Sequence, residues 1–401
     1  MRRPLCRDWG SIRWVACATT FSVAVACSSA ADAGNPSTSQ GAATDIAYNA
    51  VELPGLGGDT TVAADLNQKG DVAGWATDPS GVRHAVVWKG GLLNQLPGVA
   101  PSAAGSLNDS GTVVGAAQDP RLARPCLRRV VWTAATAQLM SEGAATSGPG
   151  AIPDTATPCA TAPLPNTSAR LPNTLINNRG SILSLLLTAP ELTGTVLYTS
   201  GQWSRLPIPP SMRTSYPYAL NNLDVVAGST CNDLGYCSSV SFSGSDVTYY
   251  DAGSVSCGTP HSHVGELETF AISDSGWALT IRRCGSLAST SLSHNGPRLT
   301  DFGSSAPTSG MIPLAVNNQG TTLLHDTTSH ALVLFQPGST VRRIVVGAGW
   351  RFDAPTVGLY QSIRGSSCTY GNRLLNDAGQ IVAQAVNTGT GRTVAVLLTP
   401  K

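Results

Sequence analysis

The chain has 401 residues, a formal net charge of +1 and only 12% charged residues, which disfavours nucleic acid or another polyanion as a partner. Its 42 Gly and 26 Pro, beside 42% hydrophobic residues, are typical of many short strands joined by turns and not of long helices. Length alone would allow two or three domains, so the internal organisation has to decide between them.

Residues 1–33 are predicted to be an export signal. A basic start precedes a 13-residue apolar stretch, Trp14 to Ala26, which is too short to span a bilayer comfortably. Two cleavage sites compete. The segment from Ala24 to Cys27 resembles a bacterial lipobox and would place a lipid on Cys27, whereas residues 31–33 suit the ordinary signal peptidase. Residues 34–44 then form a flexible linker of small and polar residues.

One short pattern recurs seven times in the remainder of the chain. It is clearest at Leu66–Gly74 and Leu107–Gly115, and more divergent copies contain Asn177, Asn221, Ser273, Asn317 and Asn376. Each copy has an apolar residue, then Asn-x-x-Gly, then β-branched residues. Asn bonds its own backbone two residues on and Gly adopts positive φ freely, so the pattern predicts a hairpin turn. The average repeat of about 51 residues, with several short strands in each, indicates propeller blades.

The first repeat shows the expected blade. Its four predicted strands are 60–66, 72–76, 84–88 and 92–96. The third strand recurs in later repeats at 128–132, 195–198, 239–242 and 330–333, whereas no convincing third strand is visible in the fifth repeat. The aromatic residues that end this strand are expected to pack between neighbouring blades; they are Trp88, Trp132, Tyr198 and Phe242.

The two ends of the repeat region complement each other. Residues 47–56 match the fourth strand of the first repeat, and the seventh repeat stops after its third strand at 394–398. Such an arrangement closes a circular array and removes exposed sheet edges. The sequence therefore predicts an all-β fold: one domain at 45–401, a β-propeller of seven four-stranded blades closed by the N-terminal strand. Six or eight blades stay open as alternatives.

The same residues resemble a known family. The pattern Asn-x-x-Gly-x-Val-x-Gly is followed by His84-Ala85 and Trp88, then by a Leu-Pro-Gly element, and His330-Ala331 repeats the dipeptide. This is similar to the HAF family of extracellular repeats over about residues 45–400, although neither dipeptide is followed by Phe. The fourth repeat departs from the pattern with Asp224 in place of the turn Gly. The resemblance implies a secreted or surface-exposed, propeller-like protein, and it brings no established catalytic residues.

Two insertions interrupt the repeats. Residues 141–170 are rich in Ala, Pro, Thr, Ser and Gly and are predicted to be a long surface loop. Residues 344–371 form a second predicted loop with the aromatic residues Trp350, Phe352, Tyr360 and Tyr370. These side chains either fold onto the propeller or face a ligand.

Seven cysteines follow the export signal, and an exported chain is expected to pair most of them. Cys231 and Cys237 flank a predicted hairpin tip, which favours a local bond. The other expected pairs are Cys126 with Cys159 and Cys257 with Cys284, which leaves Cys368 without an assigned partner. A zinc site is the less favoured reading, because no Cys-x-x-Cys occurs.

The candidate ligand-binding residues are His261, His263, Glu266, Trp350 and Tyr360. Two His at i and i+2 project the same way on a strand and could bind a metal with a carboxylate, but an exposed polar loop is the favoured interpretation. No serine-hydrolase, zinc-protease or phosphate-loop motif is present. We therefore expect no catalytic residues, no resident metal and no cofactor, while enzymatic activity stays an open question.

The favoured function is an exported, non-enzymatic binding or scaffold protein of the bacterial cell envelope. The expected partner is a glycan or an envelope protein, with no nucleic acid, and with membrane contact only through a lipid on Cys27. We expect a monomer in the periplasm, on the outer membrane surface or outside the cell. The alternative is a propeller hydrolase or lyase that acts on an extracellular polymer. Propellers host both classes of function, so the fold does not choose between them.

Overall fold

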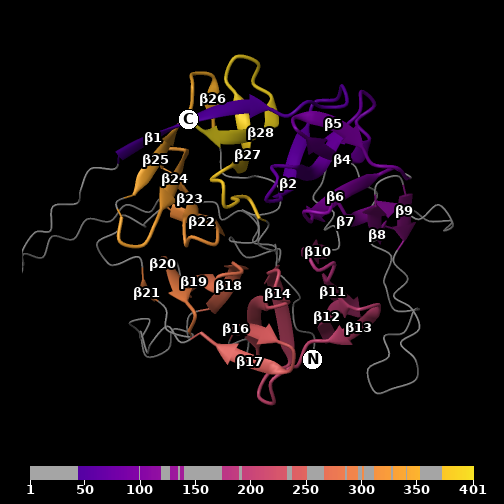
Figure 1. The fold of residues 1–401 in the computed structure, drawn as a ribbon, viewed down its shortest axis with the longest axis vertical. Helices are drawn as coiled ribbons and strands as arrows, with labels where there is room; N and C mark the ends of the chain where they lie inside the picture. Colours follow the sequence, from indigo (N-terminus) through magenta and orange to yellow (C-terminus); the bar gives the residue numbers. More distant parts are fainter. Residues whose placement is uncertain are drawn as a thin grey trace, which may run out of the picture.

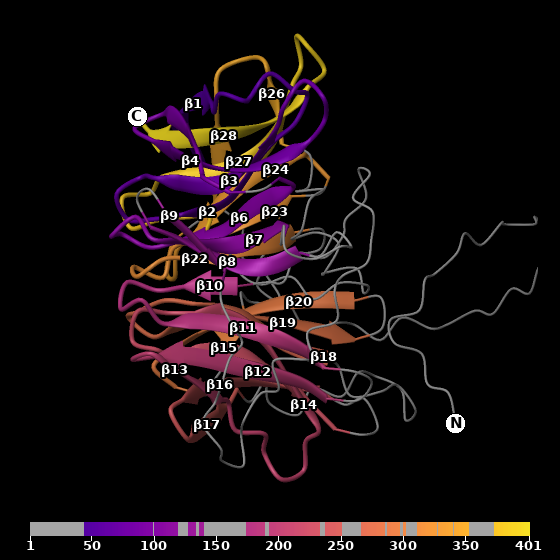
Figure 2. The same cartoon turned by 90° about the vertical axis from the view of Figure 1, so that its right-hand side faces the viewer.

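A computed structural model describes residues 44–98, 100–118, 127–133, 136–139, 174–188, 192–232, 237–250, 266–284, 287–296, 300–301, 311–326, 328–339, 341–352 and 373–401. Over these residues the chain is all-β. The sheets stand around a common axis (Figure 1), and the strands run across the molecule from one end face to the other (Figure 2). In the described residues no helix is long and apolar enough to cross a membrane.

Three antiparallel sheets of four strands follow β1 (Thr44–Glu52) in the chain. The first is formed by β2 (Thr61–Leu66), β3 (Val72–Thr77), β4 (Arg83–Lys89) and β5 (Leu92–Gln95). The second is formed by β6 (Ser102–Leu107), β7 (Val113–Gln118), β8 (Leu127–Thr133) and β9 (Thr136–Leu139). The third is formed by β10 (Thr174–Ile176), β11 (Ile182–Thr188), β12 (Leu192–Thr199) and β13 (Gln202–Arg205).

Two further sheets of the same kind come next, and the last strands share one larger sheet. The fourth sheet contains β14 (Thr214–Leu220), β15 (Val226–Cys231), β16 (Cys237–Ser243) and β17 (Asp246–Tyr249). The fifth contains β18 (Glu266–Ile272), β19 (Trp277–Cys284), β20 (Leu287–His294) and β21 (Thr300–Asp301). The remaining strands are β22 (Met311–Val316), β23 (Thr322–Asp326), β24 (Ala331–Phe335), β25 (Arg342–Val345), β26 (Trp350–Arg351), β27 (Ile381–Asn387) and β28 (Thr393–Pro400).

Strand β1 joins two groups of strands into an eight-stranded sheet, in the order β22-β23-β24-β25-β1-β28-β27-β26. Its first half, Thr44 to Ala47, pairs in parallel with β25, and its second half, Tyr48 to Glu52, pairs antiparallel with β28. Figure 1 shows the indigo β1 between the orange β25 and the yellow β28. The segment expected beside the last strand therefore lies there, and it also reaches the sixth repeat, which the sequence did not indicate.

The recurring Asn-x-x-Gly segments are tight turns between the first and second strands of each repeat. In the first repeat Asn67 Oδ1 accepts hydrogen bonds from the main-chain N–H groups of Lys69 and Asp71, at 3.0 and 2.8 Å. The turn Gly70 has φ of +84°, and Asp224, which takes the Gly position in the fourth repeat, has φ of +63°. The divergent fourth turn thus keeps the same backbone, because Asp is one of the few residues that tolerates this region.

A second glycine of the pattern is required by a close approach between strands. A Cβ on Gly115 would lie 2.2 Å from the carbonyl oxygen of Ala103 on the inner strand of the same sheet. A Cβ on Gly74 would lie 1.9 Å from Val62 O in the first sheet. The inner strands carry a bulge beside these positions, which bends them toward the second strand. The final Gly of the sequence pattern is therefore a packing requirement of the bulge.

The aromatic residues of the third strands link successive repeats, as predicted. Trp88 and Trp132 are almost fully buried. The indole N–H of Trp88 donates to Pro54 O at 2.8 Å, and that of Trp132 donates to Pro97 O at 2.7 Å. Each proline belongs to the Leu-Pro-Gly element that precedes the repeat holding the Trp. This contact explains why Trp and Leu-Pro-Gly recur together.

Three expectations about strands need correction. The fifth repeat does have a third strand, β20, which pairs with the whole of β19 although its sequence is rich in Ser and Thr. His330 lies before β24 in a turn with φ of +55° and is not part of the strand. The predicted loop 344–371 begins later than expected. Trp350 lies in β26 and pairs with Asn387 of β27, and the Phe352 side chain is buried, with 4% of its surface exposed. The loop predicted at 141–170 lies outside the described residues.

Candidate functional site at the ring axis

The turn asparagines form a ring of hydrogen bonds around the axis. In each case the side-chain Nδ2 donates to the main-chain carbonyl of the equivalent residue in the next repeat, over 2.9 to 3.3 Å. The bonds run from Asn67 to Asn108, Asn108 to Asn177, Asn177 to Asn221, Asn221 to Ser273, Asn317 to Asn376, and Asn376 back to Asn67. Only the step from the fifth to the sixth repeat departs from the pattern in these turns, because Ser273 has no amide to donate.

A second ring passes through the residues that follow the asparagines. The main-chain N–H of each donates to the side-chain oxygen of its counterpart in the next repeat, over 2.6 to 2.9 Å. The order is Gln68, Asp109, Asn178, Asn222, Asp274, Asn318, Asp377 and again Gln68. This ring includes the fifth repeat, so every turn is tied to both neighbours. Carboxylate and amide oxygens suit this position since both accept a main-chain N–H.

Asp224 adds an ionic contact to this assembly. Its carboxylate accepts hydrogen bonds from Asn177 Nδ2 at 2.7 Å and from Arg179 Nη1 at 3.1 Å. Burial alone would raise the pKa of Asp224, but hydrogen bonds from Ser181, Asn177 and Arg179, with the positive charge of Arg179, lower it below the ordinary value. Asp224 therefore stays ionised well into the acid range and supports the contact between the third and fourth repeats.

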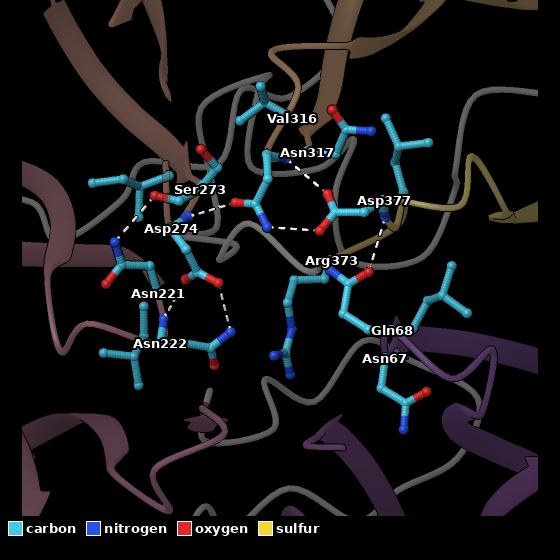
Figure 3. A pocket seen from close by; sticks show the side chains of 15 residues that line it. Asn67, Gln68, Asn221, Asn222, Ser273, Asp274, Val316, Asn317, Arg373 and Asp377 are labelled. Atoms are coloured by element: carbon cyan, nitrogen blue, oxygen red, sulfur yellow. Dashed lines mark hydrogen bonds between the residues drawn. The ribbon is translucent and has the colours of Figure 1, made fainter. Parts of the chain in front are cut away.

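One cation, Arg373, lies between the turns (Figure 3). Its Nη2 lies 2.8 Å from Asp65 Oδ2, and the Asp65 side chain is 1% exposed. The same nitrogen donates to the main-chain carbonyls of Leu107 and Ile176. Burial would lower the pKa of Arg373, but the charge and hydrogen bonds of Asp65, with the charges of nearby carboxylates, raise it. A residue of the seventh repeat thus holds the first three repeats together.

Beside Arg373 the turns enclose a cavity of about 40 Å³. It is lined by the turns of the first, fourth, fifth, sixth and seventh repeats, with Asn221, Ser273, Asn317, Asp274 and Asp377 among the lining residues. A water needs roughly 10–15 Å³ of such space, so the cavity holds a few waters or one small group. It is too small for a sugar ring, and most polar side chains around it already bond to protein.

The residues predicted to bind a ligand are not brought together by the described structure. His261, His263 and Tyr360 lie outside the described residues. Glu266 begins β18, and Trp350 lies in β26, partly buried and packed against the largest hydrophobic cluster. In the described parts of the chain no group of three or more His, Cys, Asp or Glu is placed to hold a metal ion.

One predicted disulfide is present. Cys231 and Cys237 are bonded, and they face each other across β15 and β16 at the tip of the hairpin. The bond links the end of β15 to the start of β16. Cys284 ends β19, and its expected partner Cys257 lies outside the described residues. The other predicted pair, Cys126 with Cys159, lies outside them as well, as do Cys27 and Cys368.

The sequence reasoning did not single out the axial residues. A signal for the second ring was available, since Asp or Asn follows the turn position in six of the seven repeats. Asp65 and Arg373 gave no such signal, because neither recurs in the other repeats. Their pairing depends on two residues 308 positions apart.

Comparison with solved structures supports the fold class. The chain is similar to the β-propeller domain of the Trilobed protease from Pyrococcus furiosus, described as having an open velcro topology, with 8% identity over 84% of this chain and 95% of that one and a TM-score of 0.50. Weaker likenesses are to the SapL1 lectin in complex with α-methyl fucoside (9% identity, 73% and 98% coverage, TM-score 0.37) and to the α-L-arabinanase of Penicillium chrysogenum with arabinobiose (10%, 85% and 92%, 0.36).

The low sequence identity limits the first of these likenesses to the fold, and the chain is therefore a β-propeller-like protein. No family model matches the chain. No curated protein matches it either.

Proposed function

We propose that this protein is an exported, non-enzymatic binding or scaffold protein of the bacterial cell envelope. The observation that carries the proposal is the use of the recurring polar residues. The turn asparagines and the residues after them bond to their counterparts in neighbouring repeats, and this consumes the groups that could otherwise act on a substrate. The repeated residues therefore assemble the ring, and recognition of the envelope ligand falls to residues that do not repeat.

The proposed architecture is a seven-bladed propeller of HAF type, closed by β1. Supporting it, the second hydrogen-bond ring passes through seven turns and returns to Gln68. The pairing of β1 with β28 supplies a fourth strand to the seventh repeat. Tyr48 of β1 is 2% exposed and donates its hydroxyl to Gly379 O at 3.0 Å. A strand from one end of the domain then holds the other end in place.

We place the ligand-binding face at the end opposite the asparagine turns. In each antiparallel sheet the first strand ends at its Asn turn. Because successive strands run in opposite directions, the second and fourth strands end at the other side of the ring. The long segments 140–173, 251–265 and 302–310 each join a fourth strand to the next first strand, so they start and end on that side. His261 and His263 belong to the second of these segments, whereas Tyr360 belongs to segment 353–372, which follows β26 and ends at Arg373 beside the axis. Loops on a rigid scaffold are the usual place for recognition.

The Cys231–Cys237 bond supports the proposal of export. Structural disulfides form and persist in oxidising compartments such as the periplasm or the outside of the cell. Intact-mass analysis of the natural product tests this directly. A start at Gly34 or an acylated Cys27 agrees with export, whereas an N-terminus at Met1 on a chain with reduced Cys231 and Cys237 contradicts it.

A glycan-binding screen on the exported chain tests the binding function. We expect saturable binding to an envelope glycan or protein that Tyr360→Ala weakens at least tenfold. Tyr249→Ala, an exposed aromatic in the outer strand β17, is the matched control and should bind normally. Equal effects of the two substitutions would remove the proposed face from consideration.

The alternative, a hydrolase or lyase for an extracellular polymer, is tested by metal analysis of the same preparation. A stoichiometric metal that is lost from the His261→Ala, His263→Ala double variant, together with cleavage of a polymer, would replace the scaffold proposal. His294→Ala is the control, since His294 is an exposed histidine that stacks on Trp277 in the fifth sheet.

A further inference from the structure

In the part of the chain that the structure describes, the axis of the ring holds Arg373 and, beside it, a cavity. Arg373 occupies the side of the first three repeats, where its guanidinium contacts Asp65, Leu107 and Ile176. The cavity of about 40 Å³ lies beside it, against the turns of the fourth, fifth, sixth and seventh repeats and against Leu66 to Gln68 of the first (Figure 3). The residues around Arg373 and the residues around the cavity come from equivalent positions of the repeat. The group that is bound around Arg373, a guanidinium, therefore indicates which kind of group the cavity can bind.

Equivalent main-chain groups face the axis around Arg373 and around the cavity. Leu107 and Ile176, whose carbonyls accept from Arg373, are the last residues of their inner strands before the Asn turn. Leu220, Ile272 and Val316 hold the same place in the fourth to sixth repeats and pair with the second strand in the same register. Main-chain groups alternate between the two edges of a strand, so these carbonyls also face the free inner edge. All three residues line the cavity.

The charge around the cavity is negative. The charge of Arg373 is matched by Asp65 at 2.8 Å. Asp274 and Asp377 also line the cavity, and their carboxylates bond to uncharged partners, the main-chain and side-chain amides of Asn222 and Asn318. The lining residues therefore carry one positive charge, on Arg373, and two negative charges, on Asp274 and Asp377; Asp65 adds a third negative charge beside Arg373, so the net charge of these described groups is negative.

We propose that the cavity beside Arg373 is a binding site for a small organic cation, a guanidinium or primary ammonium group. The site mirrors the intramolecular one: main-chain carbonyls of Leu220, Ile272 and Val316 correspond to those that hold Arg373, and Asp274 and Asp377 supply the negative charge. A guanidinium or ammonium head matches the cavity in size, and it provides several donors that fit carbonyl and carboxylate oxygens.

Other ligand classes fit less well. An anion would meet Asp274 and Asp377 as well as Arg373. A directly bound metal ion would need converging ligands, and no cluster of three His, Cys, Asp or Glu with that placement occurs in the described residues. The cation site is separate from the ligand face proposed above, because the Asn turns lie at the opposite end of the strands. Its failure would leave that proposal untouched.

Isothermal titration and NMR of the full exported chain test the site, with methylguanidinium and methylammonium as probes at constant ionic strength and NaCl as the reference salt. We expect saturable binding of at least one probe, weakened tenfold or more by Asp274→Asn and by Asp377→Asn. Asp246→Asn, at an exposed position in the outer strand β17, should leave binding unchanged. Circular dichroism identifies variants that fail to fold. Asp274→Asn and Asp377→Asn are called the rim variants, and either one alone is sufficient for comparison with the wild-type chain.

A further arm identifies the source of the cation. A tetrapeptide with a single arginine is titrated beside free methylguanidinium. Tighter binding of the peptide favours a protein partner that inserts a side chain into the axis, and tighter binding of the free cation favours a small metabolite. Absence of saturable binding by every probe, or equal binding by the wild-type chain and both rim variants, would overturn the proposal.

Discussion

Replacing Asn177 with alanine tests whether the turn ring carries the stability of the fold. Asn177 is fully buried. Its Oδ1 accepts from the main-chain N–H groups of Arg179 and Ser181, at 3.0 and 2.9 Å. Its Nδ2 donates to Asn221 O at 2.9 Å and to Asp224 Oδ1 at 2.7 Å. Alanine keeps none of these four bonds, and two of them join the third repeat to the fourth.

The expected loss follows from the bonds. A net value of about 1 kcal/mol for each of the four bonds, with a further penalty for buried groups left without a partner, predicts a loss of at least about 4 kcal/mol in the free energy of unfolding. Urea unfolding of the wild-type protein and the variant, monitored by tryptophan fluorescence, measures the difference in the free energy of unfolding. The two curves are compared with the same dependence of that free energy on urea concentration. Ser273→Ala is the matched control at the equivalent position. Ser273 Oγ accepts one main-chain N–H, from Trp277 at 3.1 Å, so we expect a loss of about 1 kcal/mol.

The comparison between the two variants decides the outcome. If Asn177→Ala unfolds within about 0.5 kcal/mol of the wild-type protein, the size of an ordinary surface substitution, the ring does not hold the repeats together. Equal losses for Asn177→Ala and Ser273→Ala would show that the bonds between repeats contribute nothing beyond the local turn. Either result would refute the reasoning that the recurring asparagines are retained for assembly.

Four other changes test separate parts of the structure. Ser273→Asn should complete the first ring and stabilise the fold by about 1 kcal/mol, which thermal melting would detect. Gly115→Ala should destabilise it by about 1–3 kcal/mol because the added Cβ meets the inner strand, and a neutral effect would contradict the bulge argument. Deletion of residues 45–57 should lower the melting temperature of the whole domain, whereas an unchanged temperature would argue against closure by β1. The pKa of Asp224 is lowered by folding, so its stabilisation is present at neutral pH and is lost as the pH falls below about 4; acid unfolding curves of Asp224→Asn should show less of this loss.

The strand pattern was largely predictable, because a turn motif with a local mechanism repeats along the chain. Asn and Gly each act within four residues, so their effect is visible in any single copy. The third strand of the fifth repeat was missed since β20 has no Trp, Tyr or Phe near its end and is rich in Ser and Thr. Its pairing with β19 comes from position in the sheet and not from propensity, which is a weak guide for strands.

The axial residues show where sequence reasoning stops. Asn67 could be recognised as a turn residue, but the bond from its side chain to Asn108 O in the next repeat depends on how the sheets are placed around the axis. The pairing of Asp65 with Arg373 depends on the same placement and recurs in no other repeat. Local chemistry predicts the blade, whereas contacts between blades appear only when the ring is assembled.

The departures from repetition at the axis therefore separate structural from functional residues. Six turns carry the same buried asparagine, and in each of them the side-chain Nδ2 donates to the neighbouring repeat. The fifth turn has Ser273, and the seventh repeat contributes Arg373, so the symmetry is broken on the two sides of the same axis. A ring selected for stability alone would gain from an asparagine at position 273, because the carbonyl it would reach is the same one that the other repeats use. Ser273 and Asp274 both line the cavity, which is why the axis, and not only the face with the long loops, is proposed here as a binding site.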